Sequence, residues 1–119
     1  MDDQPQVRRG LRMSLSLEPD FVVIGEARNG VESLRLAKSL LPDVIVMEIA
    51  LPDMNGIMLT ECLYDNNPRC VIIVLSINDD THTRARSLAA GAGAFVSKRQ
   101  SPEVLITTIR HVVNQFKSS

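Results

Sequence analysis

The sequence has few aromatic residues, no long apolar run and almost no net charge, and each shortage excludes a class of protein. Aromatic side chains make up 3% of the 119 residues, which leaves little surface for stacking nucleic-acid bases. The formal net charge is −1, so the basic excess of a general nucleic-acid or membrane-surface binder is absent. No apolar run approaches the roughly 18 residues that span a bilayer. We therefore expect neither direct nucleic-acid binding nor a membrane segment.

Cysteines and glycine-rich ligand loops are also scarce. Cys62 and Cys70 stand at the edges of apolar runs without the spacing of a metal site, so we expect buried, reduced thiols in a cytoplasmic protein. The acidic start, Met-Asp-Asp-Gln-Pro, lacks the apolar core that a signal peptide needs. No phosphate-loop motif is present, and the Gly91-Ala-Gly93 stretch lacks the third glycine of a dinucleotide loop.

The composition that remains is typical of one folded domain. Hydrophobic residues make up 45% of the chain and charged residues 23%, as in globular proteins with a single core. We expect a single domain over residues 1–119, with no effector domain in this chain.

Short apolar runs alternate with segments of helical spacing along the chain. The apolar runs predict strands at residues 21–27, 44–47, 70–75 and 94–97. Helical spacing and capping residues predict helices at residues 5–17, 29–41, 55–65, 81–90 and 102–116. Because a helix follows each strand, we predict a doubly wound α/β fold, a parallel sheet with helices on both faces. The expected buried positions include Leu41 and Cys62.

One stretch, residues 43–56, organises the predicted chemistry. Its apolar strand ends in Glu48, and a carboxyl end of a buried parallel strand is where open α/β sheets bind their ligands. Ser76 and Lys98 follow two other predicted strands, and an Asp2-Asp3 pair stands at the chain start. Carboxylates with one lysine and one hydroxyl suit a hard cation and a phosphoryl group.

These residues and their surroundings resemble a response-regulator receiver domain of two-component signalling, most like those of LuxR-type transcriptional regulators. The segments that carry the resemblance are residues 2–11, 23–30, 42–56, 71–76 and 93–98. The resemblance implies a flavodoxin-like receiver fold, Mg²⁺ as cofactor, and a histidine kinase or another signalling protein as partner; a homodimer stays open. It implies no enzyme beyond residual self-phosphorylation and dephosphorylation.

The resemblance also implies roles for individual residues. Asp2 and Asp3 match the acidic pair that holds Mg²⁺, and Ala50 matches the position that lends a backbone carbonyl to the metal. Glu48 matches the phosphoaccepting position, which also contacts the metal. The switch hydroxyl, the switch aromatic and the phosphate-binding lysine are matched by Ser76, Phe95 and Lys98.

The first departure from the family pattern is Glu48, where the family has aspartate. Glutamate is longer by one methylene, and a misplacement of about 1 Å can slow a positioned reaction about 100-fold. We therefore expect phosphorylation of Glu48 to be severely impaired. The longer carboxylate can instead reach Lys98 and form an ion pair that partly imitates a phosphorylated aspartate, although a phosphate carries a charge of about −1.5 to −2.

The second departure is the missing first strand, because only Met1 precedes Asp2. In the family an apolar strand precedes the acidic pair and lies inside the sheet, so its omission would expose two strand edges and invite association. We hypothesise that the coding region begins upstream and that Met1 lies within that strand. A swapped or otherwise compensated assembly is expected if the chain starts at Met1.

Three functions compete at this point. The favoured one is an atypical receiver that relays a signal through protein contacts without phosphorylation. The second is a conventional, Mg²⁺-dependent phosphoaccepting receiver that regulates transcription. The third is a degenerate remnant with no signalling role, which poor solubility or a molten state would favour.

Overall fold

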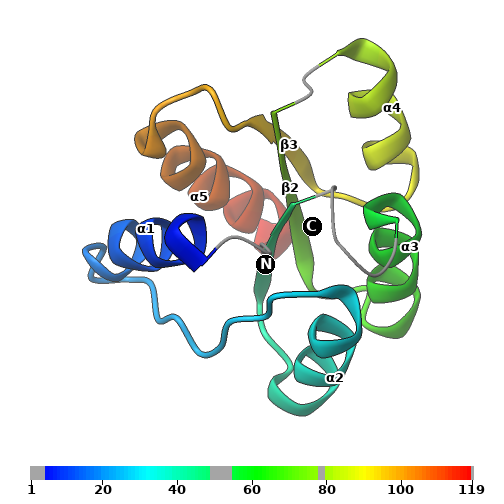
Figure 1. Ribbon diagram of the computed structural model, residues 1–119, viewed down its shortest axis with the longest axis horizontal. Helices are drawn as coiled ribbons and strands as arrows, with labels where there is room; N and C mark the ends of the chain where they lie inside the picture. Colours follow the sequence, from blue (N-terminus) through cyan, green and yellow to red (C-terminus); the bar gives the residue numbers. More distant parts are fainter. Residues whose placement is uncertain (1–4, 49–54, 78–79, 119) are drawn as a thin grey trace.

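The computed structural model describes residues 5–48, 55–77 and 80–118, which form a parallel sheet between two layers of helices (Figure 1). The strands are β1 (Val44–Glu48), β2 (Val71–Ser76) and β3 (Ala94–Ser97), in the order β1-β2-β3. The helices are α1 (Pro5–Ser16), α2 (Gly30–Leu40), α3 (Gly56–Asn66), α4 (Thr81–Ala89) and α5 (Pro102–Ser118). The predicted doubly wound α/β architecture is confirmed. None of the helices in these ranges is long and apolar enough to cross a membrane.

The central strand β2 connects the two halves of the core. All six of its residues are buried, as the unbroken apolar run predicts. Because successive side chains of a strand point to opposite faces, Ile72 and Val74 join one cluster with Leu59 of α3. Ile73 and Leu75 join the other cluster, and Figure 1 shows α1 and α5 on that side of the sheet.

Side-chain caps fix where the helices begin after the strands and loops. The Asn29 side chain accepts a hydrogen bond of 2.8 Å from the Glu32 N–H at the start of α2. Asn55 accepts one of 2.7 Å from the Ile57 N–H at the start of α3, and Asp80 accepts one of 2.7 Å from the Thr83 N–H in α4. Each cap satisfies a backbone donor that the helix itself leaves without a partner.

The strand predicted at residues 21–27 does not form, and this prediction is wrong. Phe21 to Ala27 have no regular secondary structure, although their composition is rich in β-branched and apolar residues. Strand propensity expresses how a side chain fits a pleated surface, and a strand also needs a neighbour that completes its hydrogen-bond ladder. Within the described residues β1 pairs only with β2, and residues 21–27 pair with no strand.

Several side chains predicted to be buried are exposed, and Cys62 and Leu41 are among them. Cys62 lies on the outer side of α3, whereas Cys70 is buried as predicted. Burial, with a smaller contribution from the charge of Asp43, raises the pKa of the Cys70 thiol to about 11. Leu41 is 69% exposed because α2 ends at Leu40 and Leu41 adopts the left-handed conformation, with φ of 48°, which takes it off the buried face of the helix.

Gly91 closes α4 in a conformation that suits only glycine, and its φ is 116°. A Cβ at this position would also lie 2.6 Å from Cγ of Tyr64. We expect Gly91→Ala to lower the free energy of unfolding by about 1–3 kcal/mol, the cost of a residue held in a rarely populated conformation. Urea unfolding measures the change.

Gly10 provides the matched control for Gly91. It lies within α1, and a Cβ there would meet no atom within 4 Å. Gly10→Ala should therefore leave stability unchanged or raise it by about 0.5–1 kcal/mol, the usual helix preference for alanine. Equal effects of the two substitutions would contradict the conformational role of Gly91.

Candidate functional site

The ends of the three strands bring together three of the residues that the sequence analysis selected. Glu48 is the last residue of β1, Ser76 is the last residue of β2, and Lys98 directly follows β3. The Lys98 N–H donates a 2.9 Å hydrogen bond to the Ser76 carbonyl, which continues the ladder between β2 and β3. Because all strands run in the same direction, these residues lie at one edge of the sheet, as predicted.

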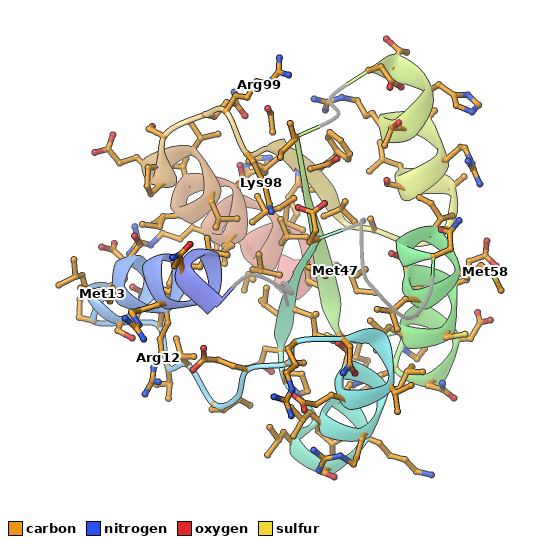
Figure 2. All side chains as sticks on the ribbon, in the orientation of Figure 1. Arg12, Met13, Met47, Met58, Lys98 and Arg99 are labelled. Carbon is orange, nitrogen blue, oxygen red and sulfur yellow. The ribbon has the colours of Figure 1, made fainter. Side chains whose placement is uncertain are left out.

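A nearly buried ion pair joins two of these strand ends. The Lys98 ammonium contacts a carboxylate oxygen of Glu48, which confirms that this pair forms. The side chains are only 17% and 8% exposed, and Lys98 lies over the strand ends in Figure 2. Removing two charges from water is costly, and their mutual attraction offsets that cost only while both partners are present. The pair therefore holds the Glu48 carboxylate against the Lys98 ammonium.

Phe95 is held inward on β3. Its side chain belongs to the buried core on the α3 side of the sheet, and Phe95 is 6% exposed. The Arg84 guanidinium lies 5.1 Å from the centre of the Phe95 ring, within the range of a cation–π interaction. No sequence signal marks this contact, because it arises only when α4 packs against β3.

The predicted metal ligands fall mostly outside the described part of the chain. Asp2, Asp3 and Ala50 are not among the described residues, so their predicted roles in holding Mg²⁺ stay predictions. Within residues 5–48, 55–77 and 80–118, no group of three or more His, Cys, Asp or Glu side chains could hold a metal ion. Glu48 is the one predicted ligand whose position is described, and its carboxylate contacts Lys98.

Curated relatives of this chain include a response regulator and transcriptional regulatory proteins. The chain is 33% identical to the nitrate/nitrite response regulator protein NarL of Escherichia coli K12, over 92% of the chain and 50% of NarL. It is 35% identical to the uncharacterized transcriptional regulatory protein YhcZ of Bacillus subtilis, over 99% of the chain and 55% of YhcZ. The chain thus spans about half the length of these relatives.

Solved structures share the fold over nearly the whole chain. A LuxR-family two-component response regulator from Aurantimonas sp. SI85-9A1 aligns with a TM-score of 0.91 and 28% identity, covering 96% of this chain and 81% of that one. The response regulator domain of Thermotoga maritima CheB aligns with a TM-score of 0.86 and 30% identity, covering 95% and 92%.

The family match agrees with these relatives. Residues 1–110 match the family described as the response regulator receiver domain, which is most of the chain and includes the three strand ends described above. The chain therefore belongs to the response regulator receiver domain family.

Proposed function

We propose that this chain is an atypical receiver that relays a signal through protein contacts without being phosphorylated. The observation that carries the proposal is the nearly buried ion pair between Glu48 and Lys98. By family resemblance, Glu48 stands at the phosphoaccepting position and Lys98 at the phosphate-binding position. The lysine charge that would meet a phosphoryl group is therefore already balanced by a side chain of the protein itself.

The pair supports a receiver biased toward one state. A phosphorylated aspartate would present a charge of about −1.5 to −2 to the lysine, whereas Glu48 presents a single negative charge. Glu48 thus imitates part of the electrostatic change of phosphorylation, and it does so permanently. A partner with higher affinity for the resulting conformation than for the other conformation would bind this chain preferentially. Only such a difference in affinity shifts a conformational equilibrium.

Mg²⁺ is the cofactor that family membership suggests for phosphoryl chemistry. Asp2, Asp3, Glu48 and the Ala50 carbonyl would hold it, and oxygen ligands of this kind suit a hard cation. When bound, the ion would neutralise charge on the phosphoryl oxygens. In the proposed function this chemistry is residual, and the chain is not an enzyme.

The proposed output surface is the face formed by α4, β3 and α5. On this face, Arg84 of α4 lies over the ring of Phe95 of β3. The proposed partner is a histidine kinase or another signalling protein, and direct DNA binding would require a further domain. Relatives named as transcriptional regulatory proteins are about twice as long as this chain, which supports that division.

Intact mass and amide NMR spectra test the proposal together. Acetyl phosphate with Mg²⁺ should leave the mass of the chain and the signals of Ser76 and Phe95 unchanged. Glu48→Gln removes the charge that Lys98 contacts, and we expect it to move those same signals. Glu61→Gln, on the exposed side of α3, is the matched control that should leave them in place. Addition of one phosphoryl group to the parent chain would instead establish the conventional receiver function.

A further inference from the structure

A groove of about 550 Å³ lies between α3 and the C-terminal end of α4. Glu61, Tyr64 and Asp65 of α3 form one wall, and residues 88–92 form the other. Figure 1 shows these two helices next to each other on one side of the sheet, where they are in contact. Because the second wall precedes β3 in the chain, the groove lies toward the other end of the strands from the candidate site described above.

The α4 wall of the groove belongs to an apolar helix face that the structure leaves exposed. Ala85, Leu88 and Ala89 have the spacing that predicts a buried face, yet all three are exposed, and Ser87 is the buried residue of this helix. Leu88 is 44% exposed, and it lines the groove together with Ala89. Exposed apolar surface with a polar rim is a common feature of protein interaction sites.

The α3 wall contributes an aromatic ring that is held in position. Tyr64 is 43% exposed, and its ring packs so closely on Gly91 that a Cβ there would lie 2.6 Å from Cγ of Tyr64. The absence of a side chain at Gly91 therefore gives the ring its place in the groove. The face of an aromatic ring attracts a cation, most often the guanidinium of arginine.

The two charged side chains that line the groove are both acidic. Glu61 and Asp65 stand four residues apart on α3, so they share one face of the helix, where like charges repel each other. In the part of the chain that the structure describes, neither carboxylate forms an ion pair and no basic side chain lines the groove. Residues 88–92 add to the negative potential, because the C-terminal end of a helix carries a partial negative charge.

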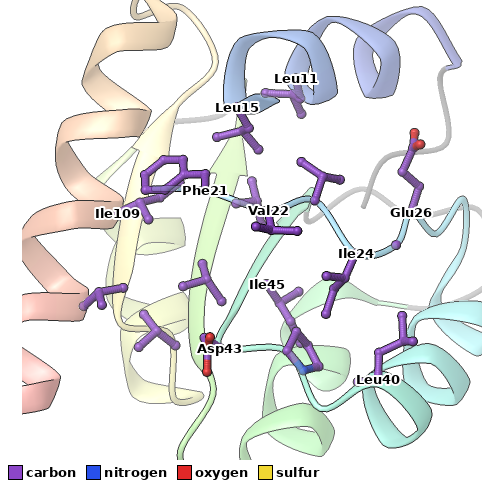
Figure 3. A pocket seen from close by; sticks show the side chains of 18 of the residues that line it. Leu11, Leu15, Phe21, Val22, Ile24, Glu26, Leu40, Asp43, Ile45 and Ile109 are labelled. Carbon is purple, nitrogen blue, oxygen red and sulfur yellow. The ribbon is translucent and has the colours of Figure 1, made fainter. Parts of the chain in front are cut away.

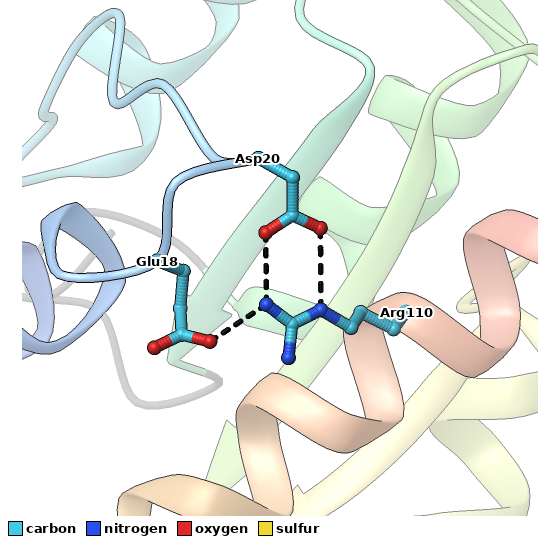
Figure 4. Close-up of polar contacts among 3 residues, drawn as sticks. All are labelled: Glu18, Asp20 and Arg110. Atoms are coloured by element: carbon cyan, nitrogen blue, oxygen red, sulfur yellow. Dashed lines mark hydrogen bonds and ion pairs between the residues drawn. The ribbon is translucent and has the colours of Figure 1, made fainter.

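Several other acidic side chains at the surface have basic partners. The Arg110 guanidinium donates hydrogen bonds of 2.8 and 3.2 Å to Asp20 and one of 2.6 Å to Glu18, as Figure 4 shows. Arg12 likewise contacts Glu26 at 3.0 Å. A larger groove of about 790 Å³ beside β1 (Figure 3) is lined by three basic and three acidic side chains, so its charges balance. The groove between α3 and α4 differs, because its two negative charges have no counterpart among its described lining residues.

We propose that the groove between α3 and α4 is a docking surface for a basic segment of a partner protein, with an arginine side chain over the Tyr64 ring and beside Asp65. Arginine suits these walls better than lysine, because its planar guanidinium can stack on an aromatic ring and also donate to a carboxylate. Apolar side chains of the same segment would cover Leu88 and Ala89. A free metal ion would use the carboxylates alone and leave the ring and the apolar wall without a contact.

This docking surface is separate from the function proposed above. The groove includes no residue of β3 or α5, and neither Glu48 nor Lys98 lines it. Binding of a basic segment therefore does not depend on phosphoryl chemistry or on the ion pair. Failure of either proposal would leave the other in place.

Fluorescence anisotropy with the full chain tests this docking surface. The probe is a labelled peptide, Leu-Arg-Ala-Leu-Arg-Ala-Leu, and the control peptide has glutamine in place of both arginines. We expect saturable binding of the arginine peptide, about ten-fold tighter than that of the control peptide, because two charged contacts of about three-fold each are lost. In amide NMR spectra the arginine peptide should move the signals of residues 61–65 and 88–92.

Substitutions place the binding in the groove. Asp65→Asn and Tyr64→Leu should each weaken it about three-fold, the usual size of an exposed ion pair or cation–π contact. Glu103→Gln removes the same charge from an exposed position on α5 that does not line the groove, and it should leave the affinity unchanged. Asp65→Asn keeps the size of its side chain, so it tests the charge without disturbing the packing of Tyr64 on Gly91.

Three results would overturn the proposal. The absence of saturable binding, or equal binding of the glutamine peptide, would show that the groove does not recognise a basic segment. Equal weakening by Asp65→Asn and Glu103→Gln would show attraction to the net charge of the chain alone. A dimer in sedimentation that excludes the peptide and dissociates with Tyr64→Leu would assign the groove to a second copy of this chain instead.

Discussion

Replacing Glu48 with aspartate is expected to let the chain take up a phosphoryl group from acetyl phosphate at least about 100-fold faster than the parent chain does. The shorter side chain withdraws its carboxylate from Lys98 by one methylene, which restores the family's residue and leaves the lysine free to meet the phosphoryl oxygens. In the reaction a carboxylate oxygen of Asp attacks phosphorus, and acetate leaves with the electron pair of the broken P–O bond. Intact mass followed over time, with Mg²⁺ in the buffer, measures both rates.

Glu48→Gln is the control for this comparison because it keeps the length of glutamate and removes the nucleophile. It should gain no phosphoryl group, so any modification it shows comes from another site. Equal rates for the parent chain and the aspartate variant, both well above that of Glu48→Gln, would show that Glu48 itself accepts phosphate. A variant as unreactive as Glu48→Gln would show that position 48 is not what limits phosphorylation.

Much of the fold could be predicted because the informative signals are local. Five helices and the strands β1, β2 and β3 follow from apolar runs, helical spacing and capping residues within each segment. The strand predicted at residues 21–27 does not form, and its absence could not be predicted from local sequence signals. Phe21 to Ala27 have strand composition, but a strand also needs hydrogen bonds to a neighbouring strand, and residues 21–27 pair with none of the described strands. Residues 21–27 instead form part of the lining of a groove beside β1.

The candidate site, like the fold, could be predicted from the sequence only in part. Glu48, Ser76 and Lys98 could be selected because parallel strands bring their carboxyl ends to one edge, and the Glu48–Lys98 pair follows from side-chain length and charge. The contact of Arg84 with Phe95 could not be predicted, since α4 has many exposed positions and nothing in its sequence marks the one that meets the ring. The ties from Arg110 to residues about 90 positions earlier depend likewise on tertiary packing.

Removing the partner of Glu48 should be the most destabilising change at the site. Lys98→Met keeps the length of the lysine stem but leaves a carboxylate that is 8% exposed without its cation. Breaking a buried ion pair from one side typically costs about 3–5 kcal/mol, and we expect a loss of about 3 kcal/mol in the free energy of unfolding by urea. Lys38→Met, at an exposed position on α2, is the matched control and should change stability by less than about 0.5 kcal/mol.

The double substitution Glu48→Gln with Lys98→Met separates two quantities. One is the free-energy cost of a buried carboxylate without its cation, and the other is the net contribution of the ion pair to stability. With both charges gone, no uncompensated ion remains, and most of the stability lost in Lys98→Met should return. Glu48→Gln alone should cost less than Lys98→Met, because the long lysine stem can carry its ammonium to water. A Lys98→Met chain as stable as the Lys38→Met control would contradict this account, since it would mean that Glu48 is solvated and that its contact with Lys98 does not hold the site in one state.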